Sequence, residues 1–264
     1  MSEPVVLCEV DSRGVATVTL NRPQLNNAYN GDVIEGLVAA FTRLGADPQV
    51  RVVVLRGNGP HFQAGADLKW IDQVRTSSAQ ENLAVSRRTA GAVQALNIFD
   101  RPTLALVHGG CFGGGIGIIA ACDVVIAERT ALFAISEARW GLHASIIIPQ
   151  LNGAMGVRQV RRYALSCERF DAERAQQLGL VHELCEPGGL DGAAAPVLDA
   201  LLHSEPGALA MTKRYALREA GLYVGEPEMD ELVEAHAKAR QTDQAREGLA
   251  SFAQKRKPAW YPSA

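Results

Sequence analysis

The segment CFGGGIGIIAACDVVIA, residues 111–127, places three consecutive glycines directly before an apolar stretch that carries no charge until Asp123. Six of the nine residues from 109 to 117 are glycine, which is too many for one continuous helix. We therefore predict a buried strand, a glycine turn and a short buried helix. Because backbone N–H groups are free at the start of a helix, such a turn suits a group that is anionic or becomes anionic.

The segment GIGIIA, residues 115–120, matches the dinucleotide-binding pattern G-x-G-x-x-A. In that fold an acidic residue follows about 20 residues later, at the end of the next strand. Here Glu128 ends the predicted strand 13 residues after Gly115, which is short for a unit of about 30 residues. No Gly-Lys-Ser/Thr of a P-loop occurs either. The role that remains for the glycine turn is to supply a backbone N–H. This N–H would donate to a neutral oxygen that becomes negative in a transition state.

A second glycine loop, FQAGADL at residues 62–68, is the candidate for a second such donor. It follows VRVVVLRG, residues 50–57, whose nearly continuous apolar character predicts a buried strand. Further strands are predicted at 15–21, 102–107 and 123–128. The first predicted helix covers 33–44, and Asp32 is its expected cap. Later helices are predicted at 79–98, 157–165, 172–178, 190–202, 207–218, 229–240 and 244–255.

The order of these elements predicts an α/β core followed, after about residue 152, by an all-helical part. With 264 residues, 47% of them hydrophobic and 21% charged, the chain can bury one large core. The net charge of −3 argues against nucleic acid and membrane partners. Residues 103–122 are free of formal charge, but their glycines make a membrane-spanning helix unsuitable.

The cysteines and the N-terminus indicate a cytoplasmic protein. The five cysteines form no C-x-x-C pair and no zinc spacing with histidines, so we expect reduced thiols and no metal. The first ten residues lack the basic region and the apolar core of a signal peptide.

The order of motifs resembles the enoyl-CoA hydratase/isomerase (crotonase) superfamily. The motifs are F-x-A-G-A-D-L, P-T-x-A-x-V-x-G, F-G-G-G, C-D and F-x-x-x-E-x-x-x-G, and the likeness extends from residue 20 to residue 260. The resemblance implies a crotonase-like spiral of ββα units over residues 1–195 and a C-terminal helical trimerisation region over residues 196–264. It also implies an acyl-CoA thioester substrate, a homotrimer or dimer of trimers, and no cofactor, since coenzyme A belongs to the substrate.

By position, the resemblance assigns the N–H groups of Ala66 and Gly114 to an oxyanion hole for the thioester carbonyl. Family members that hydrate simple enoyl-CoAs use two glutamates. One aligns with Glu137, whose apolar neighbours should raise its pKa towards a useful acid/base value. Without the resemblance, Glu137 reads equally well as an acid that favours a helix start. The other position holds Gly117, and no carboxylate lies between residues 112 and 122.

The resemblance also implies sites for coenzyme A and for the acyl group. Adenine would lie near Asn26, Ala64, Asp67 and Leu68, and Phe252 and Lys255 would reach the coenzyme A of a neighbouring subunit. The acyl pocket is expected around Trp140, His143 and Ile146, with Ile147 and Ile148 beside them. Arg139, Lys69 and His143 are candidates for holding a distal carboxylate, and His143 and Ser145 for assisting Glu137.

In lacking the first glutamate, the chain also resembles bacterial hydratases of 3-substituted glutaconyl-CoAs, which carry small residues after a similar glycine run. The sequence thus predicts a lyase that hydrates isohexenylglutaconyl-CoA or 3-methylglutaconyl-CoA, as in acyclic terpene or leucine degradation. One alternative is a Δ3,Δ2-enoyl-CoA isomerase, which needs only one glutamate. Another is a non-catalytic protein that binds coenzyme A or RNA. A Ser/His/Asp hydrolase is disfavoured because no G-x-S-x-G motif occurs.

Overall fold

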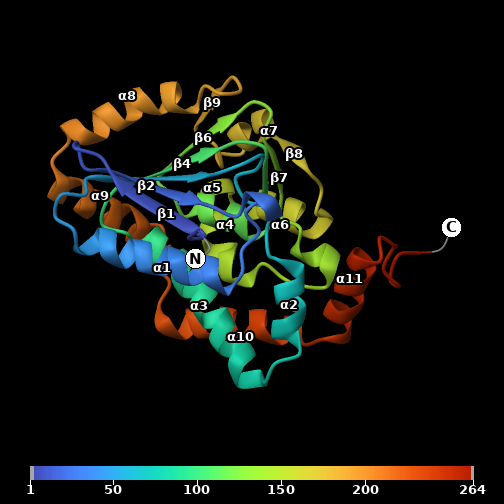
Figure 1. Ribbon diagram of the computed structural model, residues 1–264. Helices are drawn as coiled ribbons and strands as arrows, with labels where there is room; N and C mark the ends of the chain where they lie inside the picture. Colours follow the sequence, from blue (N-terminus) through green and yellow to red (C-terminus); the bar gives the residue numbers. More distant parts are fainter. Residues whose placement is uncertain (1–2, 263–264) are drawn as a thin grey trace.

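The computed structural model describes residues 3–262, which form two β-sheets surrounded by helices (Figure 1). The larger sheet has six strands in the order β1-β2-β3-β4-β6-β9, and only its β1–β2 pair is antiparallel. Its strands are β1 (Val6–Val10), β2 (Val15–Leu20), β3 (Val52–Gly57), β4 (Thr103–Val107), β6 (Val124–Glu128) and β9 (Glu183–Cys185). The smaller sheet contains β5 (Gly110–Phe112), β7 (Leu132–Ala134) and β8 (Phe170–Asp171). The predicted α/β fold class is confirmed.

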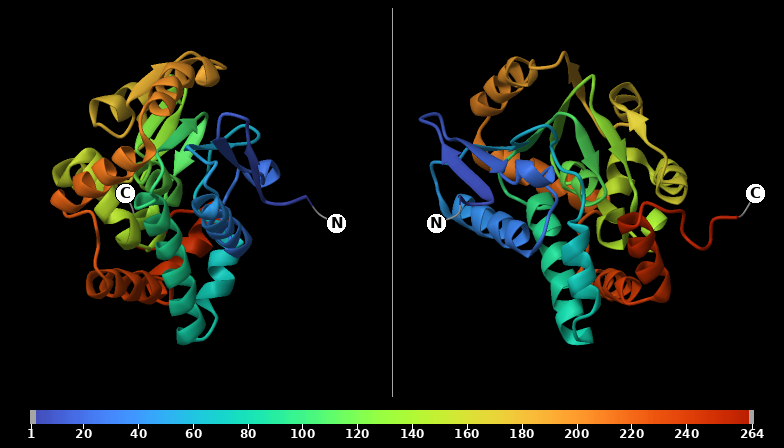
Figure 2. Two further views of the ribbon diagram at one scale, coloured as in Figure 1. Left: turned by 90° about the vertical axis from the view of Figure 1, so that its left-hand side faces the viewer. Right: turned by 45° about the vertical axis from the view of Figure 1, so that its right-hand side comes forward.

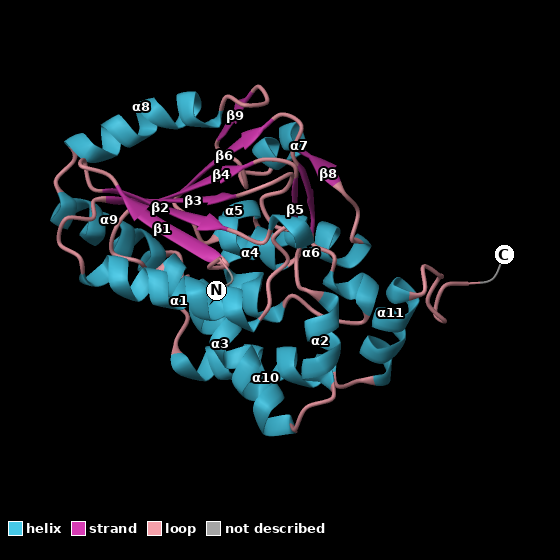
Figure 3. Ribbon diagram, in the orientation of Figure 1, coloured by secondary structure: helices cyan, strands magenta, loops and turns pink. Residues whose placement is uncertain are grey.

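The helices fall between the strands in the first part of the chain and dominate the last part (Figure 3). The α-helices are α1 (Gly31–Ala46), α2 (Leu68–Arg75), α3 (Ala79–Asn97), α4 (Gly114–Ala120), α5 (Ile148–Met155), α6 (Val157–Ser166), α7 (Ala172–Gln177), α8 (Leu190–His203), α9 (Pro206–Glu219), α10 (Glu226–Arg240) and α11 (Asp243–Ala253). Three short 3₁₀-helices are η1 (Pro23–Leu25), η2 (Glu137–Trp140) and η3 (Ser145–Ile147).

Both faces of the larger sheet are covered, which explains why its central strands read as apolar runs. On one face, Val54, Leu104 and Ile126 pack under Leu190 and Ala194 of α8. The other face holds the main core, with α1, α3 and α4 against it. Figures 1 and 2 show α8 alone above the sheet and most other helices below it.

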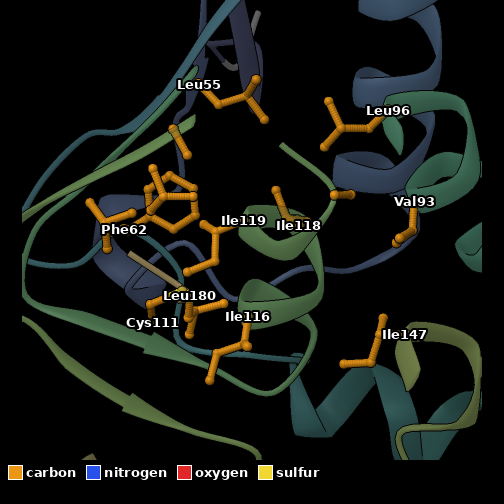
Figure 4. Close-up of a cluster of buried hydrophobic side chains, with 14 of the residues drawn as sticks. Leu55, Phe62, Val93, Leu96, Cys111, Ile116, Ile118, Ile119, Ile147 and Leu180 are labelled. Carbon is orange, nitrogen blue, oxygen red and sulfur yellow. The ribbon is translucent and has the colours of Figure 1, made fainter. Parts of the chain in front are cut away.

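Helix α4 is the predicted short buried helix after the glycine turn. Its Ile116 and Ile119 are fully buried and Ile118 nearly so, in one core cluster with Phe62 and Leu96 (Figure 4). The apolar side chains anchor this helix, so the orientation of its N-terminus is fixed by packing on every side.

Two details of the predicted elements are wrong. The cap of α1 is Asn30, whose side-chain oxygen accepts a hydrogen bond from the Val33 N–H at 3.2 Å, and not Asp32. The last part of the chain is not all-helical, because it contributes β9 to the larger sheet and β8 to the smaller one. Strands of two and three residues are too short to produce a period-two pattern, so no local pattern predicts them.

The last two helices return to the first half of the chain. Helix α10 packs along α3 (Figure 1). Helix α11 packs against η2 and α2. The predicted boundary between residues 195 and 196 falls inside α8, and the division into two units stays a prediction. Within residues 3–262 no helix is long and apolar enough to cross a membrane.

Candidate active site

The two glycine loops are hydrogen-bonded to one another through Gln63. Its N–H donates to the Gly110 carbonyl at 3.1 Å, and its carbonyl accepts from the Phe112 N–H at 2.9 Å. The fully buried Gln63 side chain also accepts from the Gly65 N–H at 3.0 Å. Segments that are about fifty residues apart in the sequence are therefore held side by side.

Each loop contains a backbone N–H that has no acceptor among the described residues. The Ala66 N–H has no acceptor among residues 3–262, although Tyr29 pairs with both neighbouring peptides. Gly114 is the first residue of α4, so its N–H has no acceptor within the helix. Ala66 and Gly114 line the same cavity. Their placement has the form of an oxyanion hole, and their role as its two donors stays a prediction.

The cavity has a volume of about 560 Å³ and extends between the glycine loops, α1, α3 and the C-terminal helices. One part of its lining is apolar and comes from α1 and α3, through Leu37, Phe41 and Leu96 among others. Another part is cationic, with Lys69, Arg139, Arg169 and Arg240. The site can thus receive a molecule with both a hydrocarbon portion and anionic groups.

Glu137 lies at the glycine turn, at the start of η2. A β-carbon added to Gly113 would lie only 3.1 Å from Glu137 Oε1, which shows how closely the carboxylate approaches the turn. Glu137 Oε2 is buried without a hydrogen-bond partner in the described chain. Burial raises the pKa of Glu137 from 4.5 to about 7, against a smaller lowering by the N–H groups of Glu137 and Ser136. The predicted rise of this pKa is supported, and the group can exchange protons near neutral pH.

Gly117 stands at the position that the resemblance assigns to a first glutamate, and Ile147 fills the space in front of it. A β-carbon at Gly117 would lie 2.3 Å from Ile147 Cγ2 and 2.8 Å from Ile147 Cβ. A glutamate introduced at position 117 would therefore collide with Ile147 instead of reaching the substrate. Two residues on different elements therefore exclude an acid from this position: Gly117 on α4 has no side chain, and Ile147 on η3 fills the space.

This contact makes a testable prediction for stability. We expect Gly117→Ala to lower the free energy of unfolding by about 1–3 kcal/mol through overpacking. Combined with Ile147→Ala, it should cost less than the sum of the two single changes, as measured by urea unfolding. Gly91→Ala in α3 is the control, since a β-carbon there meets nothing within 4 Å. Additive costs for Gly117 and Ile147 would contradict the steric account.

All three residues expected in the acyl pocket, Trp140, His143 and Ile146, line the cavity. Ile147 does as well, whereas Ile148 does not. His143 is exposed, and Ser145 is not part of the lining because its hydroxyl donates to the Leu232 carbonyl at 3.0 Å. Ser145 is therefore not placed to assist Glu137.

The residues expected around coenzyme A divide into two groups. Ala64, Asp67, Leu68 and Phe252 line the cavity, whereas Asn26 and Lys255 do not. The Asn26 carbonyl accepts from the Ala64 N–H at 3.0 Å, so Asn26 supports the loop from outside. The ring of Phe252 packs on Trp140 of its own chain, with centroids 4.7 Å apart. Contacts of Phe252 and Lys255 with a neighbouring subunit stay a prediction.

Cavity residues that the sequence did not identify include Tyr29, Arg169, His236 and Arg240. Tyr29 lies against the glycine turn, since a β-carbon at Gly114 would be 2.7 Å from its ring. For Arg240 a signal existed, because Val233, Ala237 and Arg240 share the buried stripe of α10 at helical spacing. An arginine in such a stripe needs an explanation.

The fold and the site define a class of enzyme. Two backbone N–H groups that line one partly cationic cavity with a carboxylate of raised pKa suit chemistry in which a carbonyl oxygen becomes negative while a proton is transferred. The comparisons with known proteins specify this class further.

Residues 11–262 match the family model of enoyl-CoA hydratase/isomerase, and the chain belongs to this family. A putative enoyl-CoA hydratase of Thermus thermophilus is 31% identical, with 96% of this chain and 99% of that protein covered. A mevalonyl-coenzyme A hydratase of Aspergillus fumigatus is 30% identical, with 94% and 92% covered. An enoyl-CoA hydratase structure from Shewanella pealeana aligns with a TM-score of 0.80 at 34% identity, covering 97% of this chain and 96% of that one.

Proposed function

We propose that the protein is a cofactor-free hydratase of a branched glutaconyl-CoA, either isohexenylglutaconyl-CoA or 3-methylglutaconyl-CoA. The observation that carries this proposal is that Glu137 is the only carboxylate lining the cavity that has no cationic partner in the described chain. The other lining carboxylate, Asp67, forms an ion pair with Arg22 at 3.1 Å and caps α2. One carboxylate with a pKa near 7 therefore has to serve both proton transfers.

The proposed reaction is a stepwise addition of one water molecule. The Glu137 carboxylate accepts a proton from water as the hydroxide oxygen bonds to Cβ, and the C=C electrons move towards the thioester oxygen. The N–H groups of Ala66 and Gly114 stabilise the resulting enolate oxygen. Glu137, now protonated, donates that proton to Cα, the thioester carbonyl re-forms, and the carboxylate is regenerated.

Two features of the cavity support the proposed acyl group. Its apolar lining from α1 and α3 provides room for a hydrocarbon branch, which favours the isohexenyl over the methyl substrate. Its four lysine and arginine side chains exceed the two lining carboxylates, so positive charge is available for a carboxylate on the acyl group in addition to the phosphates of coenzyme A. The Aspergillus relative acts on a mevalonyl thioester, and a mevalonyl group is also branched at Cβ.

An enoyl-CoA isomerase is the second candidate, and the single glutamate favours it. Moving a C=C bond requires that one base remove a proton from one carbon and return it to another. Glu137 alone suffices for this shuttle, and the same two N–H groups would stabilise the same enolate.

The sign of one optical signal distinguishes the two functions. Hydration removes the conjugated enoyl thioester and lowers its ultraviolet absorbance, whereas isomerisation of a 3-enoyl-CoA produces the conjugated form and raises it. We expect loss of absorbance with 3-methylglutaconyl-CoA and isohexenylglutaconyl-CoA and little change with crotonyl-CoA. A signal only with the 3-enoyl substrate would replace the hydratase proposal by the isomerase, and faster turnover of crotonyl-CoA than of either glutaconyl thioester would contradict the substrate class.

A further inference from the structure

Arg240 is a buried cation that has no anionic partner among residues 3–262. Only 1% of its surface is exposed. Its Nε donates to Asn82 Oδ1 at 2.8 Å, and its Nη2 donates to the Asn82 carbonyl at 2.9 Å and to Ser86 Oγ at 2.6 Å. All of these acceptors are neutral, and within residues 3–262 no carboxylate contributes to the pKa of Arg240, which burial lowers to about 10. A positive charge in this environment destabilises the free protein.

The remaining nitrogen of the guanidinium is available to a ligand. Nη1 donates to no acceptor in the described chain, and Arg240 lines the cavity. Tyr29 connects this cation to the reacting centre. The pKa of Tyr29 is raised to about 12 by burial and by the charge of Glu137, and the charge of Arg240 opposes that rise.

His236, one helical turn before Arg240, supplies a second donor. Because Arg240 cannot accept a hydrogen bond, Ser86 Oγ accepts from it, which leaves the Ser86 hydroxyl proton for His236 Nδ1 at 3.0 Å. This order leaves the imidazole proton on Nε2, and His236 lines the cavity. Burial and then the charge of Arg240 lower the pKa of His236 to about 3, so the ring stays neutral.

We propose that Arg240, with His236 beside it, binds the distal carboxylate of the acyl group, so that the enzyme selects dicarboxylic thioesters. This inference rests on the proposed function. It assigns a binding residue to the distal carboxylate, the part of the acyl group that takes no part in the addition of water. A carboxylate on Nη1 would neutralise the buried charge, and a neutral acyl group would leave it unpaired.

The other anions of the substrate, the phosphates of coenzyme A, fit different side chains. Lys69, Arg139 and Arg169 line the cavity and are exposed, so they can meet phosphates near bulk water. Arg240 is buried where α10 meets α3, and α10 also packs against η3, which carries Ile146 of the expected acyl pocket. This placement assigns Arg240 to the acyl end of the substrate.

Binding of two saturated thioesters tests the assignment without requiring turnover. Glutaryl-CoA carries the distal carboxylate, and valeryl-CoA is its neutral counterpart with the same coenzyme A. By calorimetry, wild type should bind glutaryl-CoA about 10- to 100-fold more tightly. Arg240→Gln, which can still donate to Asn82, should abolish this preference and leave valeryl-CoA affinity unchanged. Arg240→Lys should retain part of the preference, and Lys69→Gln and Arg139→Gln should retain all of it.

Each other outcome has a distinct meaning. Equal losses for both ligands in Arg240→Gln, or equal affinities in wild type, would overturn the assignment, because Arg240 would then serve coenzyme A or the fold. Loss of the preference in Lys69→Gln or Arg139→Gln, but not in Arg240→Gln, would overturn it in favour of that residue. A preference for glutaryl-CoA in a protein that hydrates no glutaconyl thioester would support the carboxylate site and refute the hydratase.

Discussion

Replacing Glu137 with glutamine is expected to lower kcat by about 10²–10⁴-fold on whichever enoyl-CoA wild type turns over. Glutamine keeps the shape of the side chain and loses its ability to accept and return a proton. Glu183→Gln is the matched control, because Glu183 is exposed on β9 and does not line the cavity. Initial rates of the two variants with the best substrate of wild type give the comparison. A Glu137→Gln enzyme with near-normal kcat would refute the proton-transfer role.

The same carboxylate should govern the pH dependence of hydration. Water is deprotonated by the ionised form, so kcat/KM in the hydration direction should fall as pH drops below about 7, where Glu137 becomes protonated. A profile measured from pH 5 to 9 should show this midpoint in wild type. A midpoint near 4.5, the ordinary value for a glutamate, would contradict the effect of burial.

Stability should move in the opposite direction to activity. The pKa of Glu137 is higher in the folded state, about 7, than in the unfolded chain, 4.5, so the folded state retains the proton between these values. The stabilisation from this group is complete below pH 4.5 and is lost as pH rises through 7. Relative to Glu137→Gln, wild type should lose on the order of 3 kcal/mol of unfolding free energy over this range. Urea unfolding of wild type and Glu137→Gln at pH 5 and pH 8 measures this difference in pH dependence. Wild type and Glu183→Gln should show the same pH dependence of the unfolding free energy.

The sequence was sufficient for the architecture because its strongest signals are local. The apolar runs at β3 and β4, the glycine turn and the helical periodicity of α1 and α3 each depend on neighbours in the chain. The second glycine loop was a candidate for the second donor because it also follows a buried strand. Its position beside the first loop was not predictable locally, since the hydrogen bonds through Gln63 join segments that no local pattern relates. The strands β8 and β9 were not predicted for the same reason, because only their pairing with distant strands defines them.

The chemistry of the site was predictable only in part. Glu137 was identified by position, and its apolar neighbours gave the direction of its pKa shift. The replacement of the first acid involves Gly117 together with Ile147, and only the three-dimensional structure shows that Ile147 fills the space. Arg240 lies more than a hundred residues after Glu137, so the sequence offered exposed candidates such as Lys69 and Arg139 for the distal carboxylate. Burial without a counter-ion, which distinguishes Arg240, is a tertiary property.

Gly113→Ala should lower kcat/KM by about 10²-fold or more, the effect of losing one donor of an oxyanion hole. Gly113 has φ +52° and ψ −123°, a backbone conformation that favours glycine, and it precedes the first N–H of α4. A methyl group there would lie 3.1 Å from Glu137 Oε1. The change would therefore displace the Glu137 carboxylate and rotate the Gly114 N–H at the same time.

The control for this variant is Gly156→Ala, at the junction of α5 and α6. Gly156 has φ +75°, yet a β-carbon there would meet nothing within 4 Å. Both variants should lose about 1–3 kcal/mol of unfolding free energy through backbone strain, and only Gly113→Ala should lose activity under conditions where both are folded. Equal activity of the two folded variants would mean that the glycine turn shapes the fold without positioning the reacting groups.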